Sequence, residues 1–248
     1  MPELSIRQRI NRNLKNSEFH NNEDLPVIDF FESMDNSKEY KLLEIGSGLC
    51  RFIDIIKQLY PNIKITCYEI NSKLAALAQS KGFSVIQGNF LENKIESESY
   101  DIIHCSHVIE HFQYPAITNV LDEFMRIIKA NGTIIIRSPL MWNAFFHDID
   151  HIRPYPPESI KNYFSYKQQQ KQGIYNIDIK KIWYRTQAKQ LKMIEATSIW
   201  QLCPPVKWGI NFAKKIINIV YQWLWNRFRS PATEPNGYVM IFSKQAHQ

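Results

Sequence analysis

Short apolar runs that alternate with amphipathic stretches constrain the fold of this chain more than any other feature of its sequence. The first, second and fourth runs are each followed by a stretch whose apolar residues recur with helical periodicity. Alternation of this kind predicts right-handed strand–helix–strand crossovers, and hence a largely parallel sheet with helices on both faces. The five runs cover residues 41–45, 64–70, 83–90, 100–108 and 133–139.

Two further runs bring the expected number of strands to seven, because YNIDIKKIWYR (175–185) and YVMIFSK (238–244) are both rich in β-branched and aromatic residues. Between the fifth run and these two, residues 140–173 are rich in His, Pro, Tyr and Trp, which predicts a loop and a short helix. We therefore place the chain in the α/β class.

Composition excludes several classes of protein. The chain has 248 residues and a net charge of +6, which suits an anionic substrate, an anionic membrane surface or nucleic acid, or simply solubility. Its four cysteines are scattered, which argues against a zinc site or a disulfide framework. The N-terminus lacks an apolar signal region, and no apolar run reaches the ~18 residues of a membrane span. We expect a cytoplasmic protein.

The glycine turn in LEIGSGLC stands at the first strand-to-helix connection, where Gly46 and Gly48 allow the backbone to approach a bound molecule closely. Glu69 ends the second run and has the acceptors to hold a ribose, while Asn89 follows the third run. Together they predict a nucleoside-binding pocket. Arg51 stands where a dinucleotide fingerprint requires its third glycine, which disfavours a nicotinamide cofactor.

Five ordered segments resemble the motifs of class I S-adenosylmethionine-dependent methyltransferases of the type 11 branch. They are LLEIGSGLC, YEIN, GNF, DIIHCSHVIEHF and IIKANGTIIIRSP, and they span about residues 40–140. The resemblance implies a Rossmann-like, seven-stranded, mostly parallel sheet with an antiparallel last strand, and S-adenosylmethionine as cofactor. Cys50 departs from the family's third glycine, and Asn89 from its commoner aspartate.

The resemblance also implies a set of cofactor-binding residues at the strand ends. Glu44 would orient the turn and the cofactor amine, Gly46 and Gly48 would line the methionine moiety with Ser106 beside it, Glu69 would hold the ribose, and Ile70, Asn89 and Phe90 would contact the adenine.

Transfer of a methyl group to an oxygen acceptor would need a base, and histidines are the candidates for it. An oxygen acceptor has to lose a proton, and His107, His111 and His151 are the candidate catalytic residues. Four-residue spacing would place His107 and His111 on one face if that segment is helical. On the 145–160 loop we expect substrate-binding residues, namely His147, Asp148, Arg153 and Tyr155. We expect no metal, because no second group of ligands is evident elsewhere in the sequence.

Residues 207–229 predict a strongly amphipathic helix with aromatic residues and a basic flank. Such a helix can pack on the sheet or on a partner, or lie at a membrane interface as a peripheral contact. We expect a single methyltransferase domain over 1–248, with an N-terminal helical segment (1–40), a cofactor-binding core (40–140), a lid or acceptor loop (140–173) and this helix before the last strand.

The function expected from the sequence is methyl transfer from S-adenosylmethionine, with O-methylation of a small-molecule or glycan-like acceptor favoured. The segment H-x-R-P-Y-x-P-E-S adds a looser resemblance to bacterial methyltransferases of surface-glycan and glycolipid biosynthesis. Two alternatives stay open. One is a catalytically weak or inactive methyltransferase-like subunit of a membrane or protein complex, and the other is an RNA or protein methyltransferase. Dispersed basic residues disfavour nucleic acid as a partner.

Overall fold

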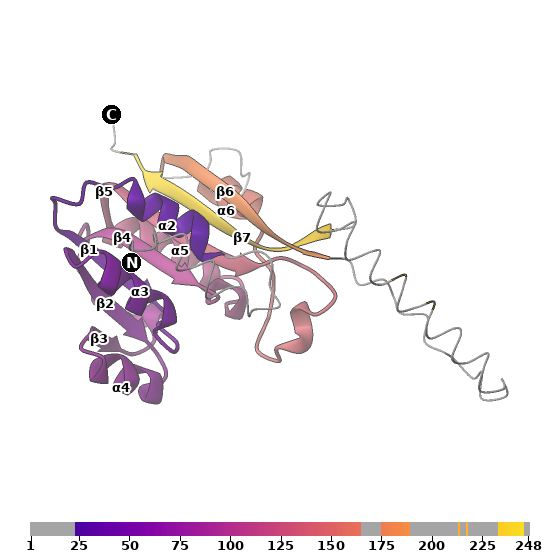
Figure 1. Cartoon of the computed structure of the whole chain (residues 1–248), viewed down its shortest axis with the longest axis horizontal. Helices are drawn as coiled ribbons and strands as arrows, with labels where there is room; N and C mark the ends of the chain where they lie inside the picture. Colours follow the sequence, from indigo (N-terminus) through magenta and orange to yellow (C-terminus); the bar gives the residue numbers. More distant parts are fainter. Residues whose placement is uncertain (1–22, 165–174, 189–212, 214–216, 218–232, 246–248) are drawn as a thin grey trace. The chain divides into compact units, whose positions relative to one another are not determined.

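The computed structural model describes residues 23–164, 175–188, 213, 217 and 233–245 (Figure 1). Contacts along the chain divide it into two compact units, residues 1–185 with 236–248, and residues 186–235. The predicted amphipathic helix at 207–229 belongs to the second unit and, except for residues 213 and 217, lies outside the described residues, so it stays a prediction.

A single seven-stranded sheet forms the centre of the first unit, with the strand order β3-β2-β1-β4-β5-β7-β6. β1 pairs in parallel with β2 and β4, β2 with β3, and β4 with β5, whereas β7 runs antiparallel to β5. The strands are β1 (Tyr40–Ile45), β2 (Ile63–Glu69), β3 (Ser84–Gln87), β4 (Tyr100–Ser106), β5 (Ile128–Pro139), β6 (Ile177–Ala188) and β7 (Thr233–Lys244).

Helices cover both faces of the sheet. The α-helices are α2 (Asp24–Glu32), α3 (Arg51–Leu59), α4 (Ser72–Ser80), α5 (Ala116–Ile127) and α6 (Pro157–Phe164), and the 3₁₀ turns are η1 (Phe90–Glu92), η2 (Ile109–His111) and η3 (Phe145–His147). One apolar cluster joins the sheet to α2, α3 and α4, and a second joins the opposite face to α5 and α6. The fold class expected from the sequence is confirmed.

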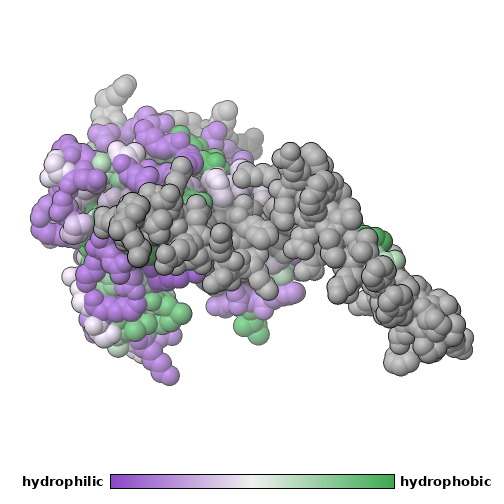
Figure 2. Space-filling view, viewed as in Figure 1, coloured by the Kyte–Doolittle hydropathy of each residue, from purple (hydrophilic) through white to green (hydrophobic). Residues whose placement is uncertain are grey.

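Burial of these apolar faces leaves a mostly hydrophilic exterior. In the view of Figure 2 the surface of the described residues is largely hydrophilic, with smaller hydrophobic patches along its lower edge. Among the helices of the described part of the chain, none has the length and apolar character needed to cross a membrane.

Local sequence explains where the elements begin and bend. Asn71 starts α4 as an N-cap, because its side-chain oxygen accepts hydrogen bonds from the backbone N–H groups of Lys73 and Leu74. The Asn131-Gly132 pair, a dipeptide typical of turns, lies inside β5 as an irregularity. Asn131 has a φ of 61° there, and the register with β4 shifts between Tyr100 and Ile102.

The carboxyl ends of the parallel strands meet the glycine turn that follows β1. Gly46 and Gly48 have φ values of 73° and 50°, in the left-handed region that favours glycine. The N–H of Gly46 donates to the carbonyl of Tyr68 on β2 (2.9 Å), which fixes the start of the turn. A Cβ atom on Gly46 would lie only 2.5 Å from Cγ2 of Val108, whereas one on Gly48 would meet no atom within 4 Å.

This difference predicts unequal effects of the same substitution at the two glycines. We expect Gly48→Ala to lower the free energy of unfolding by about 1–2 kcal/mol through backbone strain alone. Gly46→Ala should lower it by about 1–3 kcal/mol more, because its methyl group also overlaps Val108. Urea unfolding measures both values. Adding Val108→Ala should recover part of the excess for Gly46→Ala, and equal losses at the two glycines would refute the steric explanation.

Candidate functional site

Glu69, the last residue of β2, links the glycine turn to Asn71, the N-cap of α4. Its Oε2 accepts hydrogen bonds from the N–H of Gly48 (3.1 Å) and the hydroxyl of Ser47 (3.3 Å), and its Oε1 accepts one from the N–H of Asn71 (3.0 Å). The side chain is buried. A carboxylate is therefore held in place at the end of β2, beside the turn.

Cys50 completes the turn in an unusual conformation. It precedes α3 with φ 63° and ψ 12°, so a residue with a side chain adopts the left-handed region that glycine favours. Strain of this kind costs of the order of 1–3 kcal/mol. The thiol is buried in the apolar cluster beneath α3, and this burial raises its pKa. The turn therefore keeps the glycine-like backbone that the family's third glycine implies.

The ends of β2 and β3 present apolar and amide groups to this edge. Ile70 is 69% exposed. Asn89 caps η1 by accepting a hydrogen bond from the N–H of Leu91 (3.2 Å), and its carbonyl accepts one from the hydroxyl of Tyr68 (3.1 Å). Phe90 is buried edge-on against the ring of Tyr68. These contacts fix the backbone that follows β3.

Glu44 faces His104 across the β1–β4 pair, where the two residues are register partners. Nδ1 of His104 lies 2.6 Å from Oε2 of Glu44, and both side chains are buried. Burial raises the pKa of Glu44 well above its usual value, while burial and Arg137 lower the pKa of His104 well below its own. Both shifts favour the uncharged forms of this pair, which lies inside the sheet face that α2 and α3 cover.

Arg137 lies on the same face of β5 and anchors α2. Its Nη1 lies 2.5 Å from Oδ1 of Asp24, and its guanidinium carbon lies 4.3 Å from the centre of the Phe52 ring. Its Nε and Nη2 atoms are buried and find no hydrogen-bond partner among the described residues. Asp24 thus brings a helix from the N-terminal segment over the carboxyl edge of β5.

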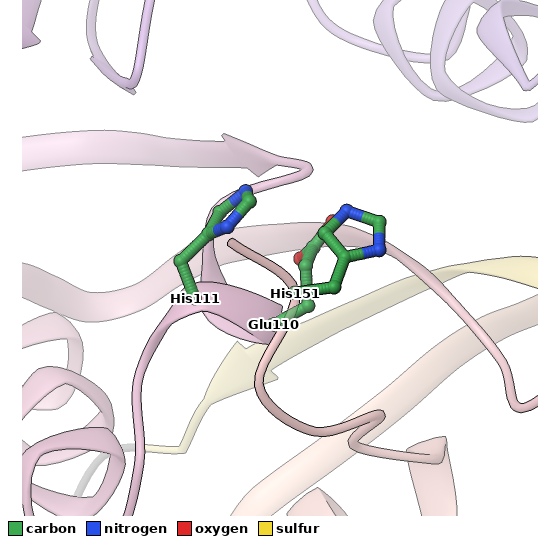
Figure 3. Close-up of side chains that lie close together, drawn as sticks. All are labelled: Glu110, His111 and His151. Carbon is green, nitrogen blue, oxygen red and sulfur yellow. The ribbon is translucent and has the colours of Figure 1, made fainter. Parts of the chain in front are cut away.

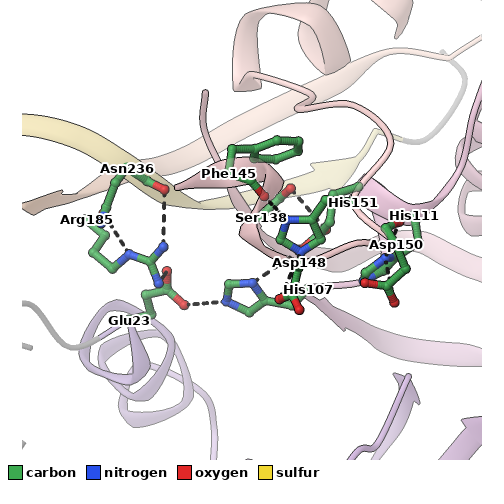
Figure 4. Close-up of polar contacts among 11 residues, drawn as sticks. Glu23, His107, His111, Ser138, Phe145, Asp148, Asp150, His151, Arg185 and Asn236 are labelled. Atoms are coloured by element: carbon green, nitrogen blue, oxygen red, sulfur yellow. Dashed lines mark hydrogen bonds and ion pairs between the residues drawn. The ribbon is translucent and has the colours of Figure 1, made fainter. Parts of the chain in front are cut away.

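His107, just beyond β4, lies between two acids (Figure 4). Its Nε2 is 3.0 Å from Oε2 of Glu23, and its Nδ1 is 3.3 Å from Oε1 of Glu110, a close ion pair whose geometry falls short of a hydrogen bond. Arg185 pairs with the other oxygen of Glu23 at 2.9 Å. Burial opposes a charge on His107, but Glu110 and Glu23 outweigh it and raise its pKa to about 9. His107 therefore carries a positive charge at neutral pH.

His107 and His111 do not share the face of an α-helix, because the segment that would have to be helical for this is not. His107 has a left-handed φ of 54°, and the segment that follows is a single 3₁₀ turn at Ile109–His111. The physical reason is the sharp turn after β4, which folds Val108 against the glycine turn and Glu110 into the interior. The two histidines reach the same carboxylate from different directions.

A second histidine pair gathers at Glu110. The rings of His111 and His151 lie 5.1 Å apart, and one ligand atom each of Glu110, His111 and His151 lies within 4.8 Å of the others (Figure 3). The carbonyl oxygen of Glu110 accepts hydrogen bonds from the N–H groups of Ile152 (2.9 Å) and Arg153 (3.2 Å). Backbone bonds thus hold the 145–153 loop on the segment after β4.

The remaining loop residues fall into two groups. His147, Asp148 and Arg153 are exposed, and Asp148 reaches within 3.7 Å of Nε2 of His151. Tyr155 is buried, and its hydroxyl donates to the carbonyl of Phe112 (2.7 Å), so the structure gives it a contact within the protein.

The structure therefore brings the three predicted histidines together, around a residue that the sequence analysis passes over. Glu110 stands in the quoted E-H pair, but its burial shows only in three dimensions. Glu23, Asp24, Arg137 and His104 were missed as well. The one sequence signal for His104 is a histidine inside an otherwise apolar strand. No sequence signal marks Glu23 or Asp24 at the start of α2.

Comparison with known proteins identifies the family of the central segment. Residues 43–136 match the family model described as a methyltransferase domain. An uncharacterized protein of Methanocaldococcus jannaschii is 25% identical over 139 residues, which cover 53% of this chain and 56% of that protein. The chain thus matches little more than half the length of that relative.

Solved structures share the fold. A SAM-dependent methyltransferase from Archaeoglobus fulgidus has a TM-score of 0.59 at 19% identity, with 94% of this chain and 99% of that chain covered. Phosphoethanolamine N-methyltransferase 2 of Haemonchus contortus, in complex with S-adenosyl-L-methionine, has a TM-score of 0.54 at 11% identity, with 90% and 52% covered. At these identities the likeness concerns the fold. Together with the family match, it shows a methyltransferase domain over residues 43–136, with the fold of S-adenosylmethionine-dependent methyltransferases.

Proposed function

We propose that the protein methylates a hydroxyl group of a small-molecule or glycan-like acceptor. The observation that carries this proposal is the convergence of His107, His111 and His151 on buried Glu110, directly after β4. Val108 in the same segment abuts Gly46, so the start of this segment lies against the glycine turn. A cofactor bound at the glycine turn would therefore transfer its methyl group to an acceptor held near the histidines.

The residues at the turn fit S-adenosylmethionine. Space is open above Gly48, where a Cβ would meet no atom within 4 Å, and Gly46 and Ser106 flank it at the ends of β1 and β4. Glu69 is a buried carboxylate with enough lone pairs to accept ribose hydroxyls besides its present donors. Exposed Ile70 offers an apolar surface for the adenine ring.

Other members of the proposed cofactor site act through the backbone. Asn89 and Phe90 would present their main chain to the adenine edge, because the Asn89 side chain already caps η1. Glu44 would act at one remove, since its carboxylate pairs with His104 beneath the turn.

When bound, S-adenosylmethionine would supply an electrophilic methyl carbon on its sulfonium, so that the acceptor oxygen could take the methyl group, sulfur could keep the C–S electron pair, and the hydroxyl would have to lose its proton. The protein's part is to align the acceptor and to draw off that proton. His111 and His151 are the groups on this chain placed to act on the hydroxyl. His107 is held between Glu23 and Glu110, which gives it a positioning role.

Exposed loop residues suit a polar acceptor. The guanidinium of Arg153 lies 5.9 Å from the Tyr155 ring and is free to meet an acidic or phosphorylated group, and His147 and Asp148 offer further hydrogen bonds. Tyr155 would shape the loop from within. The glycan assignment rests on the looser sequence resemblance, and a cytoplasmic location with a peripheral membrane contact through 207–229 belongs to the same proposal.

Replacement of Glu69 tests the cofactor site. We expect Glu69→Gln to weaken S-adenosylmethionine binding by about 1.5–3 kcal/mol, the usual contribution of hydrogen bonds to a charged group. Isothermal titration calorimetry measures it. Glu39→Gln is the matched control. Glu39 is an exposed acid that pairs with Lys64, and it lies just before β1 begins, at the end of the strand away from the glycine turn. Unchanged affinity in Glu69→Gln would remove Glu69 from the site, and absence of binding by the unaltered protein at millimolar cofactor would favour the inactive-subunit alternative.

Replacement of His111 tests the acceptor site. We expect His111→Gln to lower turnover by about 10²- to 10⁴-fold, the range of acid–base catalysis, while cofactor affinity stays the same. The acceptor is first identified by mass spectrometry of cell extract incubated with the protein and cofactor labelled in its methyl group. Full turnover by the variant would leave His111 with a structural role. A methylated RNA or protein, in place of a small molecule, would overturn the acceptor class.

A further inference from the structure

We propose that Glu110, His111 and His151 bind one divalent transition-metal ion. The donor set consists of two imidazoles and one carboxylate, brought together from η2 and from the loop before α6, with ligand atoms within 4.8 Å of one another (Figure 3). The sequence alone predicts no metal, because no second group of ligands is evident in it. The fold supplies that group by placing His151 beside the Glu110-His111 pair.

Both histidine rings have a backbone carbonyl oxygen as hydrogen-bond partner at Nδ1. Nδ1 of His111 lies 3.0 Å from the carbonyl oxygen of Asp150, and Nδ1 of His151 lies 2.7 Å from that of Phe145. A carbonyl only accepts hydrogen bonds, so each Nδ1 carries a proton, and in the neutral form of the ring the lone pair is then on Nε2. Metal-binding histidines typically donate their other N–H in this way, which fixes both tautomer and ring direction.

Glu110 provides independent support. Its side chain is fully buried, and its Oε2 accepts a hydrogen bond from the hydroxyl of Ser138 (3.2 Å). Its Oε1 is buried and accepts no hydrogen bond within the described residues, although Nδ1 of His107 lies 3.3 Å away. The positive charge of His107 offsets part of the cost of burying this oxygen, and the remaining lone pairs of the carboxylate could bind a metal ion.

The chemistry of the donors selects the ion. Imidazole nitrogens suit zinc, cobalt, iron or nickel, whereas magnesium and calcium prefer sets made of oxygen. Two histidines with one carboxylate form a ligand set of catalytic zinc sites, in which a fourth position stays open. Asp148, whose Oδ2 lies 3.7 Å from Nε2 of His151, is an exposed carboxylate at the margin of the site.

The use of this ion rests on the proposed function. An open coordination position would take the acceptor hydroxyl and lower its pKa, as a metal does for bound water. The proton would pass to solvent when the oxygen binds, and the metal-held oxygen would attack the methyl carbon. His111 and His151 would then act through the ion.

Metal binding is measured without cofactor or acceptor, so its outcome does not depend on methyl transfer. Chelator-treated, dialysed protein is titrated with Co²⁺, followed by visible absorption, and Zn²⁺ is then added as a competitor. We expect one site per chain whose affinity falls at least about tenfold in His111→Gln and in His151→Gln. His147→Gln, which changes an exposed histidine of the same loop, should keep the cation affinity. Circular dichroism checks that each variant is folded.

Absence of Co²⁺ binding up to millimolar concentration would overturn the site, as would unchanged affinity in both folded variants. Full methyl transfer by metal-free protein would overturn the catalytic use of the ion while leaving the proposed function standing. Tight binding that is lost in the two variants supports the site, even where no acceptor is methylated. In that case the proposed function fails and the metal site does not.

Discussion

The positions of the histidines and of the 145–153 loop depend on the contacts of Glu110, a buried residue in the turn after β4. Its side chain lies beneath the turn that follows β4, where Ser138 of β5 and His107 meet its two oxygens. Its backbone carbonyl holds the 145–153 loop through two N–H groups. A charged group is costly to bury, so these partners have to stay in place for the fold to be stable. One residue thereby fixes both the position of the histidines and the path of the loop that carries His151.

The sequence predicts the sheet well because its signal is local. Segments such as Ile134–Ile136 of β5 and Ile102-Ile103 of β4 are apolar without interruption, as expected for strands covered on both faces, and the structure confirms a strand at each predicted run. The β5 irregularity is harder to predict. Asn131-Gly132 indicates a turn, yet the pairing of Tyr100 with Ile128 continues the strand on the other side of it. Pairing with a neighbouring strand outweighs the local turn preference there.

The site is predicted less completely, because its contacts join residues far apart in the chain. Spacing alone suggests a helical face for His107 and His111, but the left-handed turn at His107 breaks that periodicity. Parallel register would have paired Glu44 with His104, given the strand positions. No pattern in the sequence indicates that Glu23 on the N-terminal segment meets His107, or that the carbonyl of Glu110 anchors the loop. These contacts follow from the packing of α2 and of the loop on the finished sheet.

The glycine turn shows why three neighbouring positions of one motif tolerate different residues. Gly46 is required because Val108 leaves no room for a Cβ atom. A side chain at Gly48 would meet no protein atom nearby. It would instead enter the open space where the cofactor is proposed to lie. Cys50 demands only the left-handed backbone, and its small side chain is buried in the cluster under α3. Burial of the thiol offsets part of the strain, and this explains how a cysteine can stand at the third glycine while the turn keeps its shape.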